Sequence, residues 1–346
     1  MNNSDNNFRN SNFLKKINTL TKHHIKNSNE YKFLIKKIFN NKYNAKNINQ
    51  IPFIPVRLFK EVELKSISNK QIVKTMMSSG TSNNGVSKIF LDKQTSASQI
   101  KALSKIVTSF IGSKRKPMLI IDNKSIILNR DSFSARTAAV LGFSIFGRDI
   151  EYALDKNFNL DLSKIKRFLS KHKNEEILIF GFTYIIWEKF IIQLEKLGVN
   201  LEFDNGILIH GGGWKKLQLQ SISNHDFKKK IVNLLNISKV HNYYGMVEQT
   251  GSIFMECKDG FLHSSEYSDI IIRDALTFEQ KGLNKQGLIQ LISTIPKSYP
   301  GHSILSEDVG EIYGYDNCDC GRKGTFFKVI GRVEEAEIRG CSDTFT

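Results

Sequence analysis

The chain has 346 residues, 40% of them hydrophobic, which is enough to bury the core of one large domain or two ordinary ones. Its net charge of +16 does not favour nucleic acid as a partner, because the lysines are spread along the chain without arginine and aromatic clusters, and a Lys/Asn-rich composition explains the charge better. No apolar run approaches the roughly 18 residues of a membrane span and no signal peptide is recognisable, so we predict a cytoplasmic protein without a membrane span.

The first 50 residues predict a helical lead-in. Residues 1 to about 10 look disordered, and residues 13–39 place apolar side chains among many lysines with the spacing of amphipathic helices. The proline-punctuated segment 51–60 then predicts an extended entry into the main domain.

Apolar strands and helices alternate from about residue 90 to residue 210, which favours an α/β fold with helices covering the sheet. After about residue 250, short strands with Gly and Asp turns predict a smaller β-rich part. The expected helices are 94–111, 131–141, 161–172 and 184–197, and the expected strands are 118–122, 177–180, 207–209, 288–292 and 309–312.

A hydroxyl- and glycine-rich loop that ends in a lysine is typical of phosphate binding, because small residues let backbone N–H groups approach phosphate oxygens. Gly80 and Gly85 have the spacing of a P-loop, but Val86 follows where that motif has lysine. The alternative is an ordinary Ser/Gly surface loop. The predicted phosphate-binding residues are Ser78, Ser79, Gly80, Thr81, Ser82 and Lys88.

Two further motifs suit a purine pocket. Glycines at the end of strand 207–209 allow a ring to approach the backbone closely, a tyrosine can stack on adenine, and a carboxylate nearby can hold the Mg²⁺ of a nucleoside triphosphate. Each motif by itself is more often a turn or a core bend. The residues concerned are Gly211, Gly212, Gly213, Tyr244, Gly245 and Glu248.

The order of these motifs resembles the adenylate-forming superfamily. The Ser-Ser-Gly-Thr of the phosphate loop is followed by the glycine-rich strand end, by Tyr-Gly-Met-Val-Glu at 244–248, by Ser-Glu-Asp at 306–308 and by Gly-Arg at 331–332. The superfamily patterns are Tyr-Gly-x-Thr-Glu and Thr-Gly-Asp, so Val247 and Glu307 depart from them at a hydroxyl contact and at a tight turn.

Two details narrow the resemblance. Cys-x-Cys-Gly-Arg at 318–322 and the sequence from Gly331 to the end are similar to phenylacetate-CoA-ligase-type enzymes, and most similar to the acyl-protein synthetases of bacterial luminescence fatty-acid reductases. The resemblance implies the large α/β N-terminal domain of adenylate-forming enzymes. In chain order we expect a lead-in (1–50), a nucleotide-binding core (51–250), a β-rich portion (251–332) and a tail (333–346).

The resemblance also implies that ATP activates a carboxylic acid, here a fatty acid, as an acyl-adenylate. The phosphate loop with Lys88 would hold the β- and γ-phosphates, and the three glycines with Tyr244 would frame adenine. Glu248 would bind Mg²⁺, Asp308 would accept the ribose hydroxyls and Arg332 would contact ribose or phosphate.

Most such ligases continue after the Gly-Arg region into a mobile C-terminal domain with a catalytic lysine, and we expect that domain to be missing or reduced to a tail here. The resemblance places the acyl-accepting cysteine of the luminescence synthetases at Cys341. A thiolate attacks an acyl-adenylate readily and gives a reactive thioester. The alternatives are a spectator cysteine or a sequence that stops before a second domain.

The remaining cysteines lie in two short chelating loops, Cys257-x₅-His263 and Cys318-x-Cys320. Three thiolates and one imidazole are the ligands of a closed, structural zinc site. The site would tie the loop after Glu248 to the loop before Arg332. Against this prediction, Cys-x-Cys is tighter than the usual spacing and buried cysteines without a metal are common.

We therefore predict an acid–thiol ligase whose acyl group passes to Cys341 and then to a reductase or an acyl carrier protein. The alternatives are an acyl- or aryl-CoA ligase, with CoA as the acceptor, and a catalytically inactive nucleotide-binding partner protein.

Overall fold

The computed structural model describes residues 3–78, 86–127, 135–213 and 222–333, with the backbone alone for 3–10. These residues form two compact units. Unit 1 combines the residues up to 106 with those from 245 onward, and unit 2 comprises residues 107–244. This grouping joins segments from both ends of the sequence, whereas the four expected segments follow chain order, and that expected division stays a prediction.

Unit 1 is built on an antiparallel sheet with the strand order β11-β12-β13-β14-β10-β9. The long strand β13 pairs with β12 through its first half and with β14 through its second half, and β1 adds a parallel pairing to β13. The short strands β2 and β3 form a separate hairpin. The bounds are β1 (Ile54–Pro55), β2 (Lys74–Met77), β3 (Lys88–Leu91), β9 (Phe254–Glu256), β10 (Leu262–His263), β11 (Ser268–Arg273), β12 (Gly287–Ser293), β13 (Ser303–Tyr315) and β14 (Thr325–Arg332).

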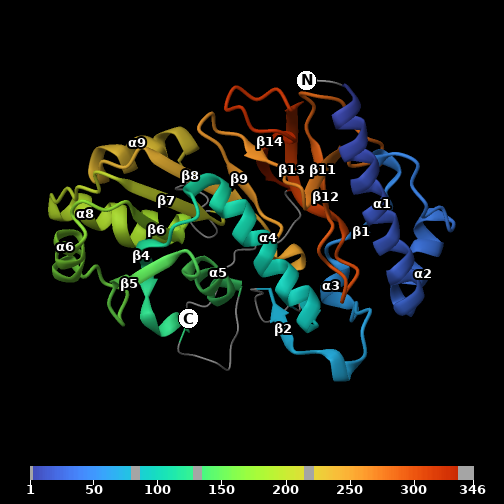
Figure 1. The fold of residues 1–346 in the computed structure, drawn as a ribbon, viewed down its shortest axis with the longest axis horizontal. Coiled ribbons are helices and arrows are strands. Elements are labelled where there is room, and N and C mark those ends of the chain that lie inside the picture. Colours follow the sequence, from blue (N-terminus) through green and yellow to red (C-terminus); the bar gives the residue numbers. More distant parts are fainter. Residues whose placement is uncertain (1–2, 79–85, 128–134, 214–221, 334–346) are drawn as a thin grey trace. The chain divides into compact units, whose positions relative to one another are not determined.

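Helices α1 (Asn3–Asn27) and α2 (Asn29–Phe39) lie beside β11 and β12 (Figure 1). Ser28 ends one helix and caps the next, because its Oγ accepts a hydrogen bond from the backbone N–H of Tyr31 at 3.3 Å. Ile17 of α1 packs with Ile271 and Ile292 of the two strands. The predicted amphipathic helices are confirmed, but the expected disorder over residues 1–10 is wrong from Asn3 onward, because extending a helix costs far less than starting one.

The remaining helical segments of unit 1 are short. They are α3 (Leu58–Glu61) and the 3₁₀ turns η1 (Ile48–Gln50), η2 (Asn69–Gln71) and η6 (Val247–Gln249). Helix α4 (Lys93–Ile111) begins in unit 1 and ends in unit 2, and it confirms the helix predicted at 94–111.

Unit 2 is a parallel sheet with the order β8-β7-β6-β4-β5. Its direction of winding reverses between β4 and β6, and in open α/β sheets ligands bind at the carboxyl ends of the strands beside such a reversal. The strands confirm the apolar segments predicted from the sequence. Their bounds are β4 (Lys116–Asn123), β5 (Gly147–Leu154), β6 (Ile177–Phe182), β7 (Gly206–Gly211) and β8 (Lys239–Tyr244).

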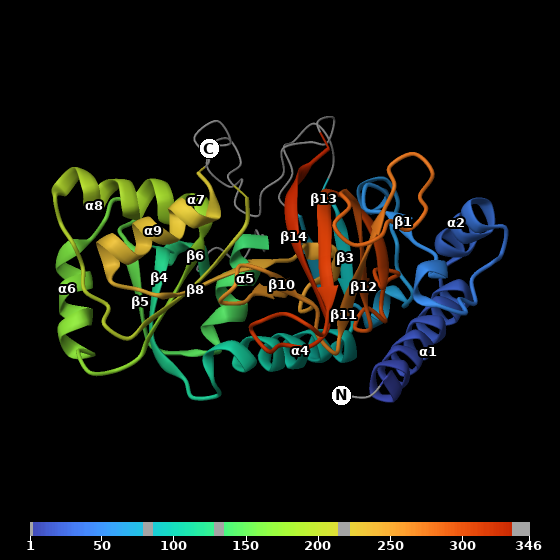
Figure 2. The same ribbon diagram turned by 90° about the horizontal axis from the view of Figure 1, so that it is seen from above.

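Helices cover both faces of this sheet, with α6, α8 and α9 on one side and α5 on the other (Figure 2). The predicted helix 184–197 is divided, because its middle turn, η4, is a π-helix, and Trp187 and Phe190 of that turn enter the core. The bounds are η3 (Lys124–Ile127), α5 (Ala135–Ser144), α6 (Leu162–Lys171), α7 (Thr183–Ile185), η4 (Ile186–Ile191), α8 (Ile192–Leu197) and α9 (Asn224–Leu235). Among the helices that the structure describes, none has the length and apolar character needed to cross a bilayer.

Candidate active site and metal centre

The base of the phosphate loop is closed by two serines at the end of the β2–β3 hairpin. Ser78 donates its backbone N–H to the carbonyl of Ser87 at 3.0 Å, and the N–H of Ser87 returns a bond to Ser78 Oγ at 2.9 Å. Lys88 begins β3 with an exposed side chain. The predicted contacts of Ser79, Gly80, Thr81 and Ser82 lie outside the described residues.

In unit 2, the predicted glycine-rich strand end is Gly211, the last residue of β7, followed by two more glycines. A Cβ on Gly211 would lie 2.3 Å from the ring of Tyr243, so only glycine fits there. Gly212 has a φ of +79° and passes close to Phe182, whereas a Cβ on Gly213 would meet no atom within 4 Å. Only Gly213 of the three therefore leaves open space beside its backbone.

The two tyrosines at the end of β8 occupy different surroundings. Tyr243 packs against Phe143 with the ring centroids 5.1 Å apart, and it is stacked on Phe180 at 6.4 Å. Tyr244, the predicted adenine contact, is half-buried. Sequence reasoning assigned no role to Tyr243, although its ring is what requires a glycine at position 211.

A buried ion pair lies at the carboxyl end of β4, beside the reversal in the sheet. Arg136, in the first turn of α5, donates Nε–H to Asp122 Oδ2 at 2.8 Å, and both side chains are 1% exposed. Burial raises the pKa of Asp122, and the guanidinium of Arg136 opposes that rise. This pair is not among the residues predicted from the sequence, although a polar residue ending a buried parallel strand is a signal of a binding edge.

Glu248 lies in the 3₁₀ turn η6 of unit 1 and is 3% exposed. Gln249, the last residue of this turn, attaches it to other segments of unit 1, because its Nε2 donates to the carbonyls of Leu291 at 3.2 Å and Gly301 at 2.8 Å. Burial, followed by the charge of Glu248, raises the pKa of Tyr299. The structure therefore provides a buried carboxylate, which is the type of protein ligand that Mg²⁺ takes.

The structure brings Asp308 and Arg332 together as opposite residues of β13 and β14. Arg332 Nε lies 3.6 Å from Asp308 Oδ1, and its Nη2 lies 3.4 Å from Glu307 Oε2. Arg57 reaches the other oxygen of Glu307 at 3.3 Å. Glu307 departs from the superfamily motif, and in the structure its carboxylate pairs with both Arg57 and Arg332 beside Asp308.

The two chelating loops meet in unit 1, and the four predicted ligand atoms all lie within 4.8 Å of one another. Cys257 Sγ is 3.9 Å from Cys318 Sγ, and Cys320 Sγ is 3.4 Å from His263 Nε2. Zinc–sulfur bonds of about 2.3 Å and zinc–nitrogen bonds of about 2.0 Å give tetrahedral edges of roughly 3.8 Å between sulfurs and 3.5 Å between sulfur and nitrogen. The two distances therefore suit a tetrahedral ion.

Burial shapes the protonation of this cluster. It raises the pKa of Cys257 and raises that of Cys318 to about 12, while it lowers the pKa of His263 to about 4. Neutral thiols next to a neutral imidazole are thus favoured when no cation is present. A bound divalent cation reverses this preference for the thiols, because it stabilises thiolates directly.

Comparison with solved structures shows the fold, which is that of adenylate-forming ligases. The open conformation of 2-hydroxyisobutyryl-CoA ligase, in complex with 2-HIB-AMP and CoA, is similar over 94% of this chain and 75% of that chain, with a TM-score of 0.72 and 12% identity. The luciferase-like enzyme of the nonluminescent mealworm Zophobas morio is similar over 79% of this chain and 60% of that chain, with a TM-score of 0.50 and 15% identity.

Sequence comparison gives the family. The chain is 22% identical over 309 residues to the long-chain-fatty-acid–luciferin-component ligase of Aliivibrio fischeri, covering 86% of this chain and 79% of that protein. It is 21% identical over 313 residues to the ligase of the same name from Vibrio harveyi, covering 86% and 78%. The LuxE family of acyl-protein synthetases matches residues 2–346, and the chain belongs to this family. The predicted family, the α/β fold and the acyl-protein ligase class are confirmed.

Proposed function

We propose that the chain activates a long-chain fatty acid with ATP and transfers the acyl group to a protein thiol. The family match over residues 2–346 carries this proposal, and the names of the two ligases from Aliivibrio fischeri and Vibrio harveyi support the choice of a fatty acid. A carboxylate oxygen of the acid attacks the α-phosphorus of ATP, and the bond to pyrophosphate breaks. The products are an acyl-adenylate and pyrophosphate.

The proposed nucleotide contacts are the residues that the sequence motifs indicate. The loop at 78–82 with Lys88 would hold the leaving pyrophosphate, and Glu248 would hold the Mg²⁺ that neutralises part of its charge. Gly213, with open space beside its backbone, and Tyr244 are the proposed adenine contacts. Gly211, Gly212 and Gly245 would shape the backbone around them.

Asp308 would accept hydrogen bonds from the ribose hydroxyls, and Arg332 would hold ribose or the α-phosphate. In unit 1 the two residues are already aligned by the pairing of β13 with β14 and by Glu307. Such alignment before binding favours an in-line attack, because less ordering remains to be done in the transition state.

Cys341 is the proposed first acyl acceptor, although it lies outside the described residues. Its thiolate would attack the carbonyl carbon of the acyl-adenylate, the bond to AMP would break, and a thioester would remain for a reductase or an acyl carrier protein. Coenzyme A is the second candidate acceptor, since the 2-hydroxyisobutyryl-CoA ligase with the same fold was solved with CoA.

We propose zinc as the ion held by Cys257, His263, Cys318 and Cys320. The close distances among their ligand atoms and the three-thiol donor set support this choice. With four protein ligands the ion would have no open position, so its role would be to fix the β13–β14 turn to β10 and to the end of β9. Reduced thiols are required, which agrees with the predicted cytoplasmic location.

The test of adenylation is the acid-dependent exchange of labelled pyrophosphate into ATP. The wild type is expected to exchange with long-chain acids, and Glu248→Gln is expected to lose at least about 100-fold. Cys341→Ser should keep exchange but lose the hydroxylamine-labile acyl label on the protein. Retention of that label in Cys341→Ser would move the acceptor elsewhere, and acyl-CoA formation at a higher rate than self-acylation would favour the CoA ligase.

A further inference from the structure

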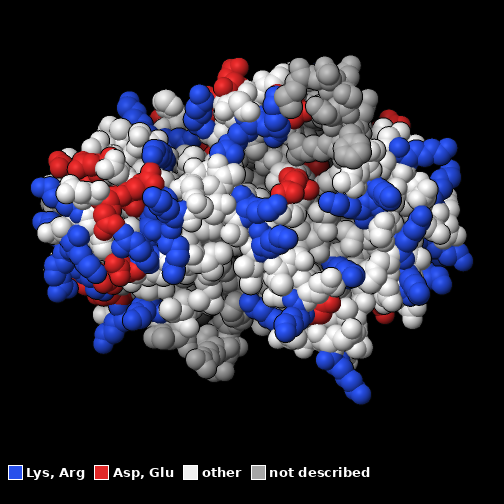
Figure 3. Space-filling model, in the orientation of Figure 1, with Lys and Arg blue, Asp and Glu red and all other residues white. Residues whose placement is uncertain are grey.

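An exposed surface at the N-terminal end of the sequence combines positive charge with large apolar side chains. Residues 11–50 contain nine lysines and one acidic residue, Glu30. All nine lysines are exposed, and no ion pair joins any of them to a described carboxylate. Basic side chains accordingly gather over α1 and α2 in Figure 3.

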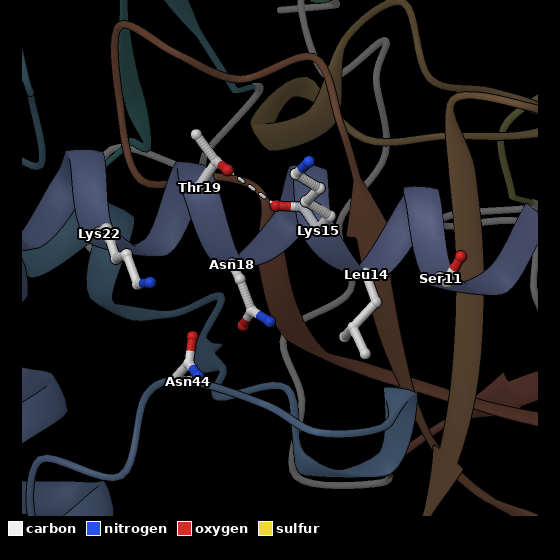
Figure 4. A pocket seen from close by; sticks show the side chains of 7 residues that line it. All are labelled: Ser11, Leu14, Lys15, Asn18, Thr19, Lys22 and Asn44. Carbon is white, nitrogen blue, oxygen red and sulfur yellow. Dashed lines mark hydrogen bonds between the residues drawn. The ribbon is translucent and has the colours of Figure 1, made fainter.

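The outward stripe of α1 is almost entirely polar. Ser11, Lys15, Thr19, Lys22 and Lys26 recur at intervals of three or four residues, opposite the buried stripe that packs on the sheet. Beside this stripe lies a hollow of about 380 Å³, which is completed by Asn44 from the segment after α2 (Figure 4). The ammonium groups of Lys15 and Lys22 and the side-chain amide of Asn44 are hydrogen-bond donors suited to an anionic headgroup.

Helix α2 adds apolar groups among its lysines. Phe33 is 59% exposed on the outer face, Lys37 lies over its ring at 5.7 Å, and Ile38 is 46% exposed near the end of the helix. Apolar side chains that remain exposed among cations suit the boundary between lipid headgroups and acyl chains.

The loop between β11 and β12 continues this surface beyond the end of α2. Phe39 contacts Phe53 with ring centroids 5.3 Å apart, and Phe53 contacts Phe278 of the loop at 6.0 Å. Leu276, two residues away, is 90% exposed, the largest exposed fraction among the exposed large hydrophobic residues that the structure describes. The loop thus presents a bare aliphatic side chain next to the basic helices.

We propose that this surface, formed by the outer faces of α1 and α2 and the tip of the β11–β12 loop, docks on an anionic lipid bilayer. Charge complementarity favours an anionic partner, and the exposed Phe33 and Leu276 favour lipid over nucleic acid, whose grooves offer them little apolar contact. The preference for a bilayer over an acidic protein rests on the proposed function, because a long-chain fatty acid substrate partitions into bilayers.

Helix α1 of this surface is attached to the rest of unit 1 through a buried histidine. His24 of α1 is buried, with Nδ1 2.8 Å from Ser66 Oγ and Nε2 3.2 Å from the carbonyl of Pro296, so the helix is attached to the body of unit 1. Binding therefore requires no ordering of α1, which avoids the entropy cost that a disordered basic arm would incur.

The experiment is flotation of the full chain with vesicles, without ATP or fatty acid. We expect binding to vesicles of phosphatidylglycerol and phosphatidylcholine, no binding to phosphatidylcholine alone, and release at high salt. The double variant Lys36→Gln with Lys37→Gln should lower the partition coefficient about 25-fold, since each lysine near an anionic surface contributes roughly fivefold. Leu276→Ser should lower it about tenfold.

The matched control is Lys166→Gln with Lys196→Gln, two exposed lysines on α6 and α8 of unit 2. It changes the net charge equally and should leave the partition coefficient within twofold. Equal loss in both double variants, or no binding of the wild type to anionic vesicles, would overturn the proposal. Pyrophosphate exchange measured in detergent-free buffer with the same variants should stay at the wild-type rate, which separates a failure of docking from a failure of the proposed reaction.

Discussion

The sulfur atoms of Cys257 and Cys318 lie 3.9 Å apart, although 61 residues separate them in the sequence. The distance is almost twice a disulfide bond length and close to the sulfur–sulfur edge of a tetrahedral zinc site. Because His263 and Cys320 complete the same cluster, the strands β9, β10, β13 and β14 converge on one point of unit 1.

If zinc occupies this point, the protein purified without chelators should contain one equivalent per chain. Replacing Cys318 and Cys320 with serine should remove the metal and lower the free energy of unfolding by roughly 4 kcal/mol or more. Metal analysis with urea unfolding measures both effects, and Cys341→Ser, which leaves the cluster intact, is the control. Metal that stays bound to the double variant would contradict the site.

Gly211 should tolerate no side chain, because a Cβ would lie 2.3 Å from the ring of Tyr243. We expect Gly211→Ala to lower the free energy of unfolding by about 1–3 kcal/mol, the usual range for overpacking. Gly213→Ala, two residues further along the chain and with open space for a Cβ, should change it by less than about 0.5 kcal/mol. Equal urea midpoints for the two variants would show that the ring moves away at no cost.

The buried histidines should make the protein less stable in mild acid. Burial lowers the pKa of His302 to about 3 and that of His24 well below its usual value, so the unfolded chain binds more protons than the folded one below about pH 6.5. Their contribution to stability is therefore present above pH 6.5, and each histidine removes about 1.4 kcal/mol per pH unit as the pH falls toward its folded pKa.

Urea unfolding at pH 7 and pH 5 tests this sign. His302→Gln should make the slope of the unfolding free energy against pH shallower by the equivalent of about one bound proton. The control, His225→Gln at an exposed position of α9, should leave this slope unchanged. A pH slope unchanged by His302→Gln would contradict the account.

Removing one charge of the Asp122–Arg136 ion pair should lower the free energy of unfolding more than replacing both residues with apolar ones. Asp122→Ala would leave the guanidinium buried beside Phe158 without its carboxylate, at a cost of about 3–5 kcal/mol. The double variant Asp122→Leu with Arg136→Met should cost less than either single charge removal. Equal losses in unfolding experiments for Asp122→Ala and the double variant would argue against strong coupling.

The regular elements could be predicted because the local pattern decides them. The apolar strands at 118–122 and 177–180 are buried on both faces in the structure, so their hydrophobic runs were informative. The Cys/His cluster could be predicted for a similar reason, since each loop supplies two candidate ligands at short spacing and only their meeting depends on the fold.

What could not be predicted depends on contacts between distant residues. Nothing in the sequence near Arg136 indicates that it will be buried against Asp122. At position 307 the superfamily motif has glycine, and the sequence alone does not show that Glu307 pairs with Arg57 and Arg332. The π turn at η4 is likewise set by packing, because its sequence has the apolar period of an ordinary helix.

The most direct test of the central claim is pyrophosphate exchange into ATP by the wild type across acids of increasing chain length. We expect exchange that depends on the acid, that is strongest with long-chain fatty acids, and that survives Cys341→Ser but not Glu248→Gln. An absence of exchange with every acid, in protein shown to be folded, would contradict adenylation and favour a nucleotide-binding partner protein without ligase activity.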